Sequence, residues 1–369
     1  MRIAINASSL KASLYHTFIQ LARLHPDDTF IFFYHSETNT TDYPENIIPV
    51  VVKPQSTIPL KRRIWYNMKL LLALKRTKAD IFISESFVSL KTKIPQVLLS
   101  PDLTYIFHPA IIDKKQISFY KKNTFKFLNK AEKIVVNSSF LKNEIIERFN
   151  IEKEKIKVIY PEVKKELNSI SQEEREAIKE RYAGGNEYFI YSGIISTEQN
   201  LVNLLKAFSF FKKRQRSKMQ LIVTGKHGAK YDEFVRSLQS YRFKNEVIIL
   251  KEVTSNETQK ILASAYAMLY VPLYESEGDE VINAMNLQVP LIVSNTGFLE
   301  EYCGDAALYV DPNNFNDIAE KMMELFKDEH KRKDLTEKGK LQIAKFLDEK
   351  REDILFDLVK NEAKKNPLG

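Results

Sequence analysis

Strand-like and helix-like runs alternate from one end of the 369-residue chain to the other. Short apolar runs such as residues 81–84 indicate buried strands, whereas Leu14, Phe18 and Leu21 recur at the spacing of one helical face. This alternation is typical of parallel sheets whose strands are joined by helical crossovers. Because the chain is too long for one ordinary core, we expect two α/β domains with parallel sheets.

The two halves of the chain each carry a set of expected strands. In the first half these are residues 2–7, 29–34, 48–52, 81–84, 96–100, 133–137 and 157–160. In the second half they are residues 188–192, 220–224, 247–250, 267–271, 291–294 and 308–310. Polar residues 162–185, with a short helix over 172–182, join the halves, and the tail over 315–365 is expected to be helical. We therefore expect domains over 1–165 and 166–349, and a C-terminal helix over 350–369 that can cross back to the first domain.

Charge is spread unevenly along the chain. Residues 1–170 hold 27 Lys and Arg against 16 Asp and Glu, whereas residues 171–369 hold 29 against 32. Such a basic half favours an anionic partner, such as a membrane surface or a phosphorylated substrate. The alternative is a composition that is simply rich in lysine. Residues 61–76 are basic, aromatic and helical in pattern, as interfacial membrane helices are, or they form an ordinary helix with a basic outer face. Nucleic acid also fits the charge, but no nucleic-acid-binding motif accompanies it.

Glycine and cysteine are scarce. The chain has ten glycines, and the first is Gly184, so a phosphate-binding loop in the first half would have to be built without glycine. A single cysteine, Cys303, excludes an internal disulfide and a multi-cysteine metal site. No run of eighteen apolar residues is present, and the first residues indicate a strand instead of a signal peptide. We expect a cytoplasmic protein, with the peripheral inner face of the membrane as the alternative location.

A family resemblance is carried by four segments in a fixed order. Residues 271–310, which begin V-P-L-Y-E-S-E-G-D-E-V-I-N-A-M and end C-G-D-A-A-L-Y-V, resemble the donor-site region of the retaining group 1 glycosyltransferases. Residues 191–201, Y-S-G-I-I-S-T-E-Q-N-L, are similar to a second motif of that family, and residues 101–109 to its H-D-L segment. Residues 131–161 resemble the strand, Ser-capped helix and strand that close its first domain. The resemblance implies the GT-B fold, in which two Rossmann-like parallel-sheet domains face each other across a cleft.

The resemblance also implies a reaction, the transfer of a sugar from a nucleotide-sugar donor to a glycan or lipid-linked acceptor with retention. It implies no cofactor, no metal and no nucleic-acid partner. The implied catalytic residue is Glu275. The implied donor-binding residues are Gly193, Lys226, Gly278, Asn283 and Glu301. The implied acceptor-side residues are Ser9, His16 and Asp102.

Several family positions carry other residue types in this chain. Asn283 stands where the family has the second carboxylate of its pair, and Ile194 and Gln199 stand where it has the Arg and Lys that neutralise the donor diphosphate. Pro101 replaces the acceptor-side histidine, and residues 8–13 lack the glycines of the loop after the first strand. Losing two charge-assisted contacts of roughly 1.5–3 kcal/mol each would weaken donor binding severely. The alternative to an active enzyme is therefore a catalytically degenerate relative that serves as a binding or partner module.

One cation is a candidate replacement for the missing pair. Lys226 follows a buried strand and Gly225, so its ammonium is expected at the carboxyl end of that strand. Acidic residues of the loop at 275–280 repel a diphosphate unless a cation, a helix N-terminus or a metal compensates. We expect Lys226 to lie within reach of that loop.

Overall fold

The computed structural model divides the chain into two compact units. One comprises Met1–Tyr160 together with Lys350–Gly369, and the other comprises Pro161–Glu349. The structure describes all residues except 11, 38–41, 54–64, 86–89, 102, 110–111, 162, 164–169, 229, 252, 275–277, 348–350 and 366–369.

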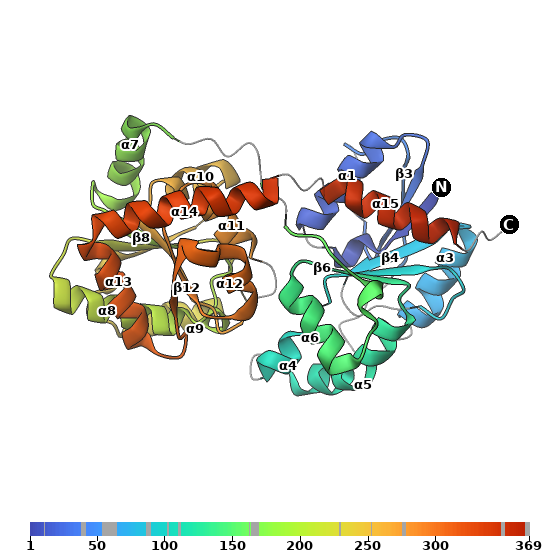
Figure 1. The fold of residues 1–369 in the computed structure, drawn as a ribbon, viewed down its shortest axis with the longest axis horizontal. Coiled ribbons are helices and arrows are strands. Elements are labelled where there is room, and N and C mark those ends of the chain that lie inside the picture. Colours follow the sequence, from blue (N-terminus) through green and yellow to red (C-terminus); the bar gives the residue numbers. More distant parts are fainter. Residues whose placement is uncertain are drawn as a thin grey trace. The chain divides into compact units, whose positions relative to one another are not determined.

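The N-terminal unit is built on a seven-stranded parallel sheet with the order β3-β2-β1-β4-β5-β6-β7 (Figure 1). Its strands are β1 (Arg2–Ile5), β2 (Thr29–Tyr34), β3 (Ile47–Val51), β4 (Ile81–Glu85), β5 (Gln96–Leu99), β6 (Lys133–Val136) and β7 (Ile156–Val158). The strand order reverses between β1 and β4. A crevice at such a switch point is where open parallel sheets bind ligands.

Helices cover both faces of this sheet. They are α1 (Ala12–Leu24), α3 (Leu71–Arg76), α4 (Thr104–Phe107), α5 (Lys114–Lys130), α6 (Ser139–Phe149) and α15 (Arg351–Lys364). Ile3 and Ile81 point toward α1 and α15, and the alternate residues Ala4 and Phe82 point toward α3. Leu98 packs with α5 and α6 and pairs in register with Ser84, which shares a face with Phe82. The helices α3, α5 and α6 therefore cover the same face of the sheet, opposite α1 and α15.

The C-terminal helix α15 completes the core of the N-terminal unit. Leu355, Phe356 and Val359 of this helix are buried among the residues of β1, β2 and α1. The ring of Phe356 stacks on His25 at 3.4 Å between centroids. The last helix of the chain therefore contributes to the stability of the first domain.

The C-terminal unit has a six-stranded parallel sheet with the order β10-β9-β8-β11-β12-β13. Its strands are β8 (Tyr188–Ser192), β9 (Gln220–Thr224), β10 (Val247–Leu250), β11 (Ala267–Tyr270), β12 (Leu291–Ser294) and β13 (Ala307–Val310). Its helices are α7 (Gln172–Ala183), α8 (Leu201–Gln215), α9 (Tyr231–Leu238), α10 (Ser255–Ala263), α11 (Asp279–Asn286), α12 (Gly297–Cys303), α13 (Phe315–Lys327) and α14 (Glu329–Leu347). Five of the six strands are buried at nearly every residue, as expected of a parallel sheet covered on both faces, and the edge strand β10 is mostly half-buried.

The sequence-based expectation of two parallel-sheet domains is confirmed, and each expected strand is present with ends that differ by at most two residues. The Ser138 hydroxyl caps α6 by accepting a hydrogen bond from Leu141 N at 3.1 Å, which gives residues 131–161 the Ser-capped helix that the resemblance implies. The expected helical tail over 315–365 is present and is divided into three helices, the first break falling where α13 ends at Lys327 and α14 begins at Glu329. Asp328 between them has an extended backbone, and its carboxylate accepts from Lys331 N at 2.9 Å, so it caps a new helix.

We predict that Leu355→Ala destabilises the N-terminal unit. Leu355 is 1% exposed within the core that α15 shares with α1, and truncating such a leucine costs about 2–5 kcal/mol. The only tryptophan, Trp65, belongs to this unit, so tryptophan fluorescence during urea denaturation follows its unfolding. Leu341→Ala on α14, where the side chain is 71% exposed, is the control and should leave the transition in place. An unchanged midpoint for Leu355→Ala would contradict the role of α15.

Candidate functional site

The predicted donor-binding residues follow four neighbouring strands of the C-terminal sheet. Lys226 follows β9, Gly193 follows β8, Gly278 and Asn283 follow β11, and Glu301 follows β12. In the sheet order these strands are adjacent, and all run parallel. Their carboxyl ends therefore form one rim of the sheet, which we call the donor rim, and this rim is the place where such sheets bind ligands.

Two glycines allow the loops after β8 and β9 to touch through their backbones. A Cβ on Gly225, whose φ is +135°, would lie 1.7 Å from the carbonyl oxygen of Gly193. Gly193 N donates to Thr224 O at 3.1 Å, and Ile195 N donates to Lys226 O at 2.8 Å, so the strand pairing continues beyond the sheet. No side chain fits between these loops, and the backbone that precedes Lys226 is fixed against the neighbouring loop.

The loops after β11 and β12 meet in the same way. Gly278 has a φ of +81°, and a Cβ there would lie 2.4 Å from the ring of Tyr302. Tyr302 is fully buried and follows Glu301 on α12. This contact brings the start of α11, which carries Asn283, against the helix that carries Glu301.

Asn200 ties three loops of the donor rim together. Its buried side-chain amide donates to Val271 O at 2.8 Å, after β11, and to Pro312 O at 2.7 Å, after β13. Asn200 itself lies between β8 and α8 in the left-handed conformation, with a φ of +61°, which Asn tolerates better than most residues. Nearby, Ser294 Oγ donates to Pro272 O at 2.6 Å and joins β12 to the loop after β11.

The electrostatics of the donor rim differ from those of a site with two diphosphate-binding cations. Ile194 is 51% exposed, so an apolar side chain meets solvent where the resemblance implies an arginine. Gln199 is partly exposed, and its Oε1 has no hydrogen-bond partner among the described residues. Lys226 is exposed at the carboxyl end of β9. The exposed His227 ring beside it stacks on Tyr231 at 3.6 Å.

The acidic side of the donor rim is described only in part. Glu275, the predicted catalytic residue, lies outside the described residues, so its reach to Lys226 stays a prediction. Asn283 on α11 and Glu301 on α12 are both partly exposed. Asp279 and Glu280 occupy the first turn of α11. Within the residues that the structure describes, no group of three or more His, Cys, Asp or Glu side chains is arranged to hold a metal ion.

The predicted acceptor-side residues belong to the N-terminal unit. Ser9 lies in the short helix that follows β1, and His16 is exposed on α1. Asp102, which follows β5, lies outside the described residues. The neighbouring Ser8 Oγ accepts from His35 N at 2.8 Å and fixes the loop after β1 to the end of β2.

Sequence reasoning missed several polar residues at the carboxyl edge of the N-terminal sheet. Glu85, the last residue of β4, is fully buried, and Asn6, which follows β1, is equally buried. The hydroxyls of Tyr15, Tyr34 and Tyr43 are hydrogen-bonded to one another, with 2.6 Å between Tyr34 and Tyr43. Burial, followed by the hydrogen bond to Tyr15, raises the pKa of Tyr34. A carboxylate directly after the apolar run of β4 is the signal that could have identified Glu85.

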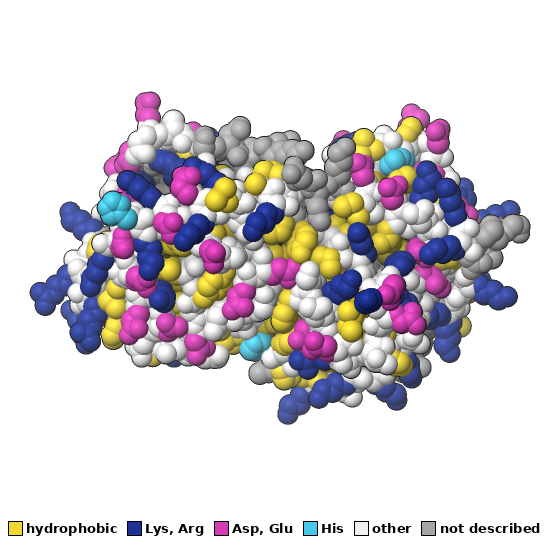
Figure 2. Space-filling model, viewed as in Figure 1, with side chains coloured by type: hydrophobic (Ala, Val, Ile, Leu, Met, Phe, Trp, Pro, Cys, Tyr) yellow, Lys and Arg dark blue, Asp and Glu magenta, His cyan; other side chains and the backbone are white. Residues whose placement is uncertain are grey.

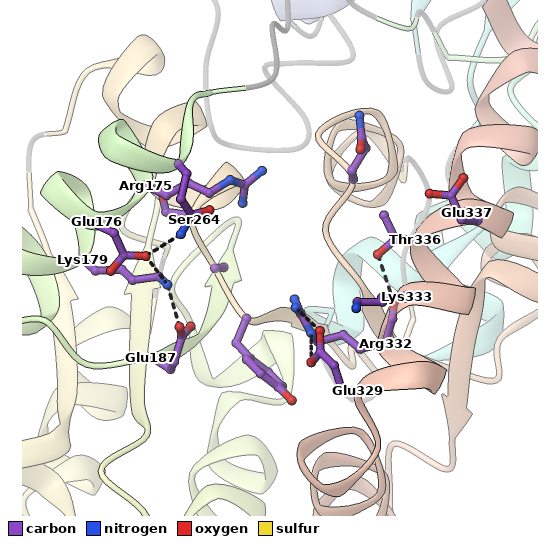
Figure 3. A pocket seen from close by; sticks show the side chains of 14 residues that line it. Arg175, Glu176, Lys179, Glu187, Ser264, Glu329, Arg332, Lys333, Thr336 and Glu337 are labelled. Carbon is purple, nitrogen blue, oxygen red and sulfur yellow. Dashed lines mark hydrogen bonds and ion pairs between the residues drawn. The ribbon is translucent and has the colours of Figure 1, made fainter.

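A cavity of about 510 Å³ lies at the opposite edge of the C-terminal sheet (Figure 3). Residues before β8, β11 and β12 line it together with α7 and α14. Four of its charged side chains are paired with each other: Lys179 bonds to Glu187 at 2.6 Å, and Arg332 to Glu329 at 2.7 Å (Figure 3). Because it lies at the amino ends of the strands, it is separate from the donor rim and holds none of the predicted site residues.

Cys303 is not a candidate nucleophile. It is fully buried in α12, and burial raises the pKa of its thiol, so the thiolate is not formed at neutral pH.

Two parallel Rossmann-like domains whose carboxyl edges carry the polar residues define the class of GT-B-fold proteins. A family model for "Glycosyl transferases group 1" matches residues 172–342, and one for "Glycosyltransferase Family 4" matches residues 16–166. The chain belongs to the group 1 glycosyltransferases.

Among the described residues, no helix is both long and apolar enough to span a bilayer.

Similar proteins and structures agree with this assignment. The chain is 23% identical to O-antigen chain mannosyltransferase B of Escherichia coli over 81% of the chain and 77% of that protein. It is 26% identical to the O-antigen chain mannosyltransferase RfbU of Salmonella typhimurium over 72% of the chain and 71% of that protein. The fold matches sucrose-phosphate synthase from Thermosynechococcus elongatus with a TM-score of 0.82 at 13% identity, covering 99% and 100% of the two chains. It matches HepE of Anabaena in complex with UDP and glucose with a TM-score of 0.75 at 13% identity, covering 98% and 99%.

We predict that Asn200→Asp loosens the donor rim. The substitution keeps the shape of the side chain but removes both amide hydrogen bonds and places a carboxylate against two carbonyl oxygens. Leaving these buried groups unsatisfied should cost about 3 kcal/mol or more. Far-UV circular dichroism during urea denaturation measures the loss, and Asn256→Asp, at an exposed position on α10, is the control. Equal urea midpoints for the two variants would contradict the role of Asn200 in holding these loops together.

Proposed function

We propose that this protein transfers a hexosyl unit, with mannose the first candidate, from a nucleotide-sugar donor to a glycan or lipid-linked acceptor with retention. The observation that carries the proposal is the donor rim, where Gly193, Lys226, Gly278, Asn283 and Glu301 follow four adjacent strands. The named relatives support the sugar, because the O-antigen enzymes of Escherichia coli and Salmonella are mannosyltransferases. The complex of HepE with UDP-glucose supports a nucleotide-sugar as the donor.

The chemistry requires a leaving diphosphate to be stabilised as the glycosidic bond breaks. In this proposal Lys226 supplies the cation, and the N-terminus of α11 adds a weaker favourable field. Glu275 contacts the donor sugar, and Asn283 hydrogen-bonds a ribose hydroxyl as a neutral substitute for a carboxylate. No cofactor or metal is required. The acceptor is bound by the carboxyl edge of the N-terminal sheet, where Ser9, His16 and Asp102 are the candidate contacts.

A lipid-linked acceptor requires access to a membrane surface. We propose a cytoplasmic protein that lies at the inner face of the membrane, with residues 61–76 as one point of contact. Of these, Met68 and Leu72 are 58% and 54% exposed on the same side of the helical segment, next to Lys69. Residues 61–64 lie outside the described part of the chain.

A second candidate function is a non-catalytic binding or partner module. The exposed Ile194 and the neutral Gln199 favour it, because both stand at the positions where the family places diphosphate-binding cations. The two functions differ in whether a nucleotide-sugar binds at all.

We predict that the chain binds one nucleotide-sugar. Titration calorimetry with GDP-mannose, UDP-glucose and ADP-glucose, each with and without Mg²⁺, should give heat with one donor at submillimolar to millimolar concentration. The proposal assigns one cation, Lys226, to the diphosphate in place of the family's two, so we expect weak binding. Absence of heat with every donor at millimolar concentration would reject the enzyme and favour the partner module.

We predict that Lys226→Ala weakens binding of the selected donor by roughly 1.5–3 kcal/mol, about ten- to a hundredfold in Kd. Lys218→Ala is the matched control, because Lys218 is also exposed and lies just before β9, at the opposite end of the same strand. Thermal denaturation should be the same for both variants. If Lys226→Ala binds the donor as tightly as Lys218→Ala does, Lys226 does not replace the missing cations.

A further inference from the structure

The helix α5 has an unusual composition for a surface helix. Its 17 residues, K-K-Q-I-S-F-Y-K-K-N-T-F-K-F-L-N-K, include six lysines and no aspartate or glutamate. Thr124 and Leu128 are buried against the sheet, and Ile117 packs beside them. The helix is therefore anchored by one narrow side, and the charge is on the remainder of its surface.

The outward side of α5 combines lysines with exposed aromatic rings. At roughly 100° per residue, Phe119 and Phe125 fall on either side of Lys115, Lys122 and Lys126, within about a third of the helix circumference. Phe125 is 51% exposed and Phe119 is 41% exposed, and the three lysines are also exposed. Figure 2 shows Lys and Arg side chains along the margin of this unit where α4, α5 and α6 lie in Figure 1.

The helix α3 extends this surface on the same face of the N-terminal sheet. Leu74 buries α3 against Phe82, whose face of the sheet is the one that α5 and α6 also cover. Leu72 of α3 is more than half exposed, as is Met68, which lies beside Lys69 in the helical segment Trp65–Leu70 that leads into α3. Two separate helices on one face therefore present apolar side chains surrounded by lysine.

We propose that α5, together with α3, forms a docking face for an anionic lipid surface. Lysines alone would bind any polyanion, but exposed phenylalanine, leucine and methionine side chains would bury no apolar surface against a hydrated polyanion. They gain from burial at the boundary between lipid headgroups and acyl chains, and lysines beside them gain from anionic headgroups. Residues 1–170 hold 27 Lys and Arg against 16 Asp and Glu, and this positive charge also favours an anionic surface.

This inference deepens the proposed function and rests on it in one respect, since a lipid-linked acceptor would be met at this face. Binding to a bilayer requires no sugar, so it is measured independently of transfer. Donor binding by the variants described next should equal that of the parent, because α5 and the donor rim belong to different units.

The test is sedimentation of the full chain with vesicles of phosphatidylcholine containing phosphatidylglycerol, and with vesicles of phosphatidylcholine alone. Binding is expected only to the anionic vesicles and should decrease as salt is raised. The triple variant Lys115→Gln, Lys122→Gln, Lys126→Gln should lower the partition coefficient about ten- to a hundredfold. The matched control is Lys206→Gln, Lys213→Gln, Lys218→Gln, which removes the same charge from exposed positions of the C-terminal unit and should change it less than twofold.

The apolar contribution is tested by Phe125→Ser against Leu341→Ser, an exposed leucine of α14. Phe125→Ser should lower binding to anionic vesicles several-fold, and Leu341→Ser should not. Equal loss in both triple variants would show that only net charge matters and would overturn the docking face. Unchanged binding by Phe125→Ser, together with displacement of the parent from anionic vesicles by an equal charge concentration of soluble polyphosphate, would identify a site for soluble polyanions and overturn the lipid as its occupant. Circular dichroism confirms that each variant is folded.

Discussion

The close approach of backbones at the donor rim is the constraint on which the rest of the C-terminal unit depends. Gly225 allows the loop after β9 to touch Gly193, and the Asn200 amide holds the loops after β11 and β13 at hydrogen-bond distance. These contacts involve main-chain atoms, so they fix where the loops lie while leaving the exposed side chains free to vary. A rim built in this way keeps its shape when the residues that contact a ligand are replaced.

This separation explains how the chain retains the architecture of a glycosyltransferase while the positions where the family places diphosphate-binding cations are neutral. Ile194 O accepts from Tyr191 Oη at 2.9 Å, so the backbone at this position is fixed whatever side chain it carries. An arginine could occupy the position without moving the loop, and the isoleucine there is more than half exposed. The change at Ile194 is therefore one of ligand chemistry and not of folding.

Most of the fold was predictable from the sequence, because buried parallel strands appear as continuous apolar runs and amphipathic helices repeat every three to four residues. The break at Asp328 was not predicted, since a single capping carboxylate interrupts an otherwise helical composition. The positions of the donor-rim residues could be predicted from the order of the motifs, but the hydrogen bonds by which Asn200 joins the loops could not. Its partners, Val271 O and Pro312 O, are 71 and 112 residues away and are backbone atoms with no sequence signature. Glu85 and the tyrosine cluster were missed for a related reason, because the burial of Glu85 and the hydrogen bonds between Tyr15, Tyr34 and Tyr43 depend on contacts between separate segments of the chain.

The distribution of charge gives the two units different requirements. In the proposed function, a nucleotide-sugar reaches the donor rim from solution, so its occupancy depends on the few favourable charges that the rim offers, of which Lys226 is the candidate. A lipid-linked acceptor is instead concentrated at a surface, and a protein docked there meets it at a local concentration set by the membrane. Weak electrostatics at the donor rim then limit the donor step alone, and a basic face on the N-terminal unit favours the acceptor step without changing the donor site. A chain with this division can lose donor-binding cations and retain slow transfer, provided that the membrane keeps the acceptor within reach.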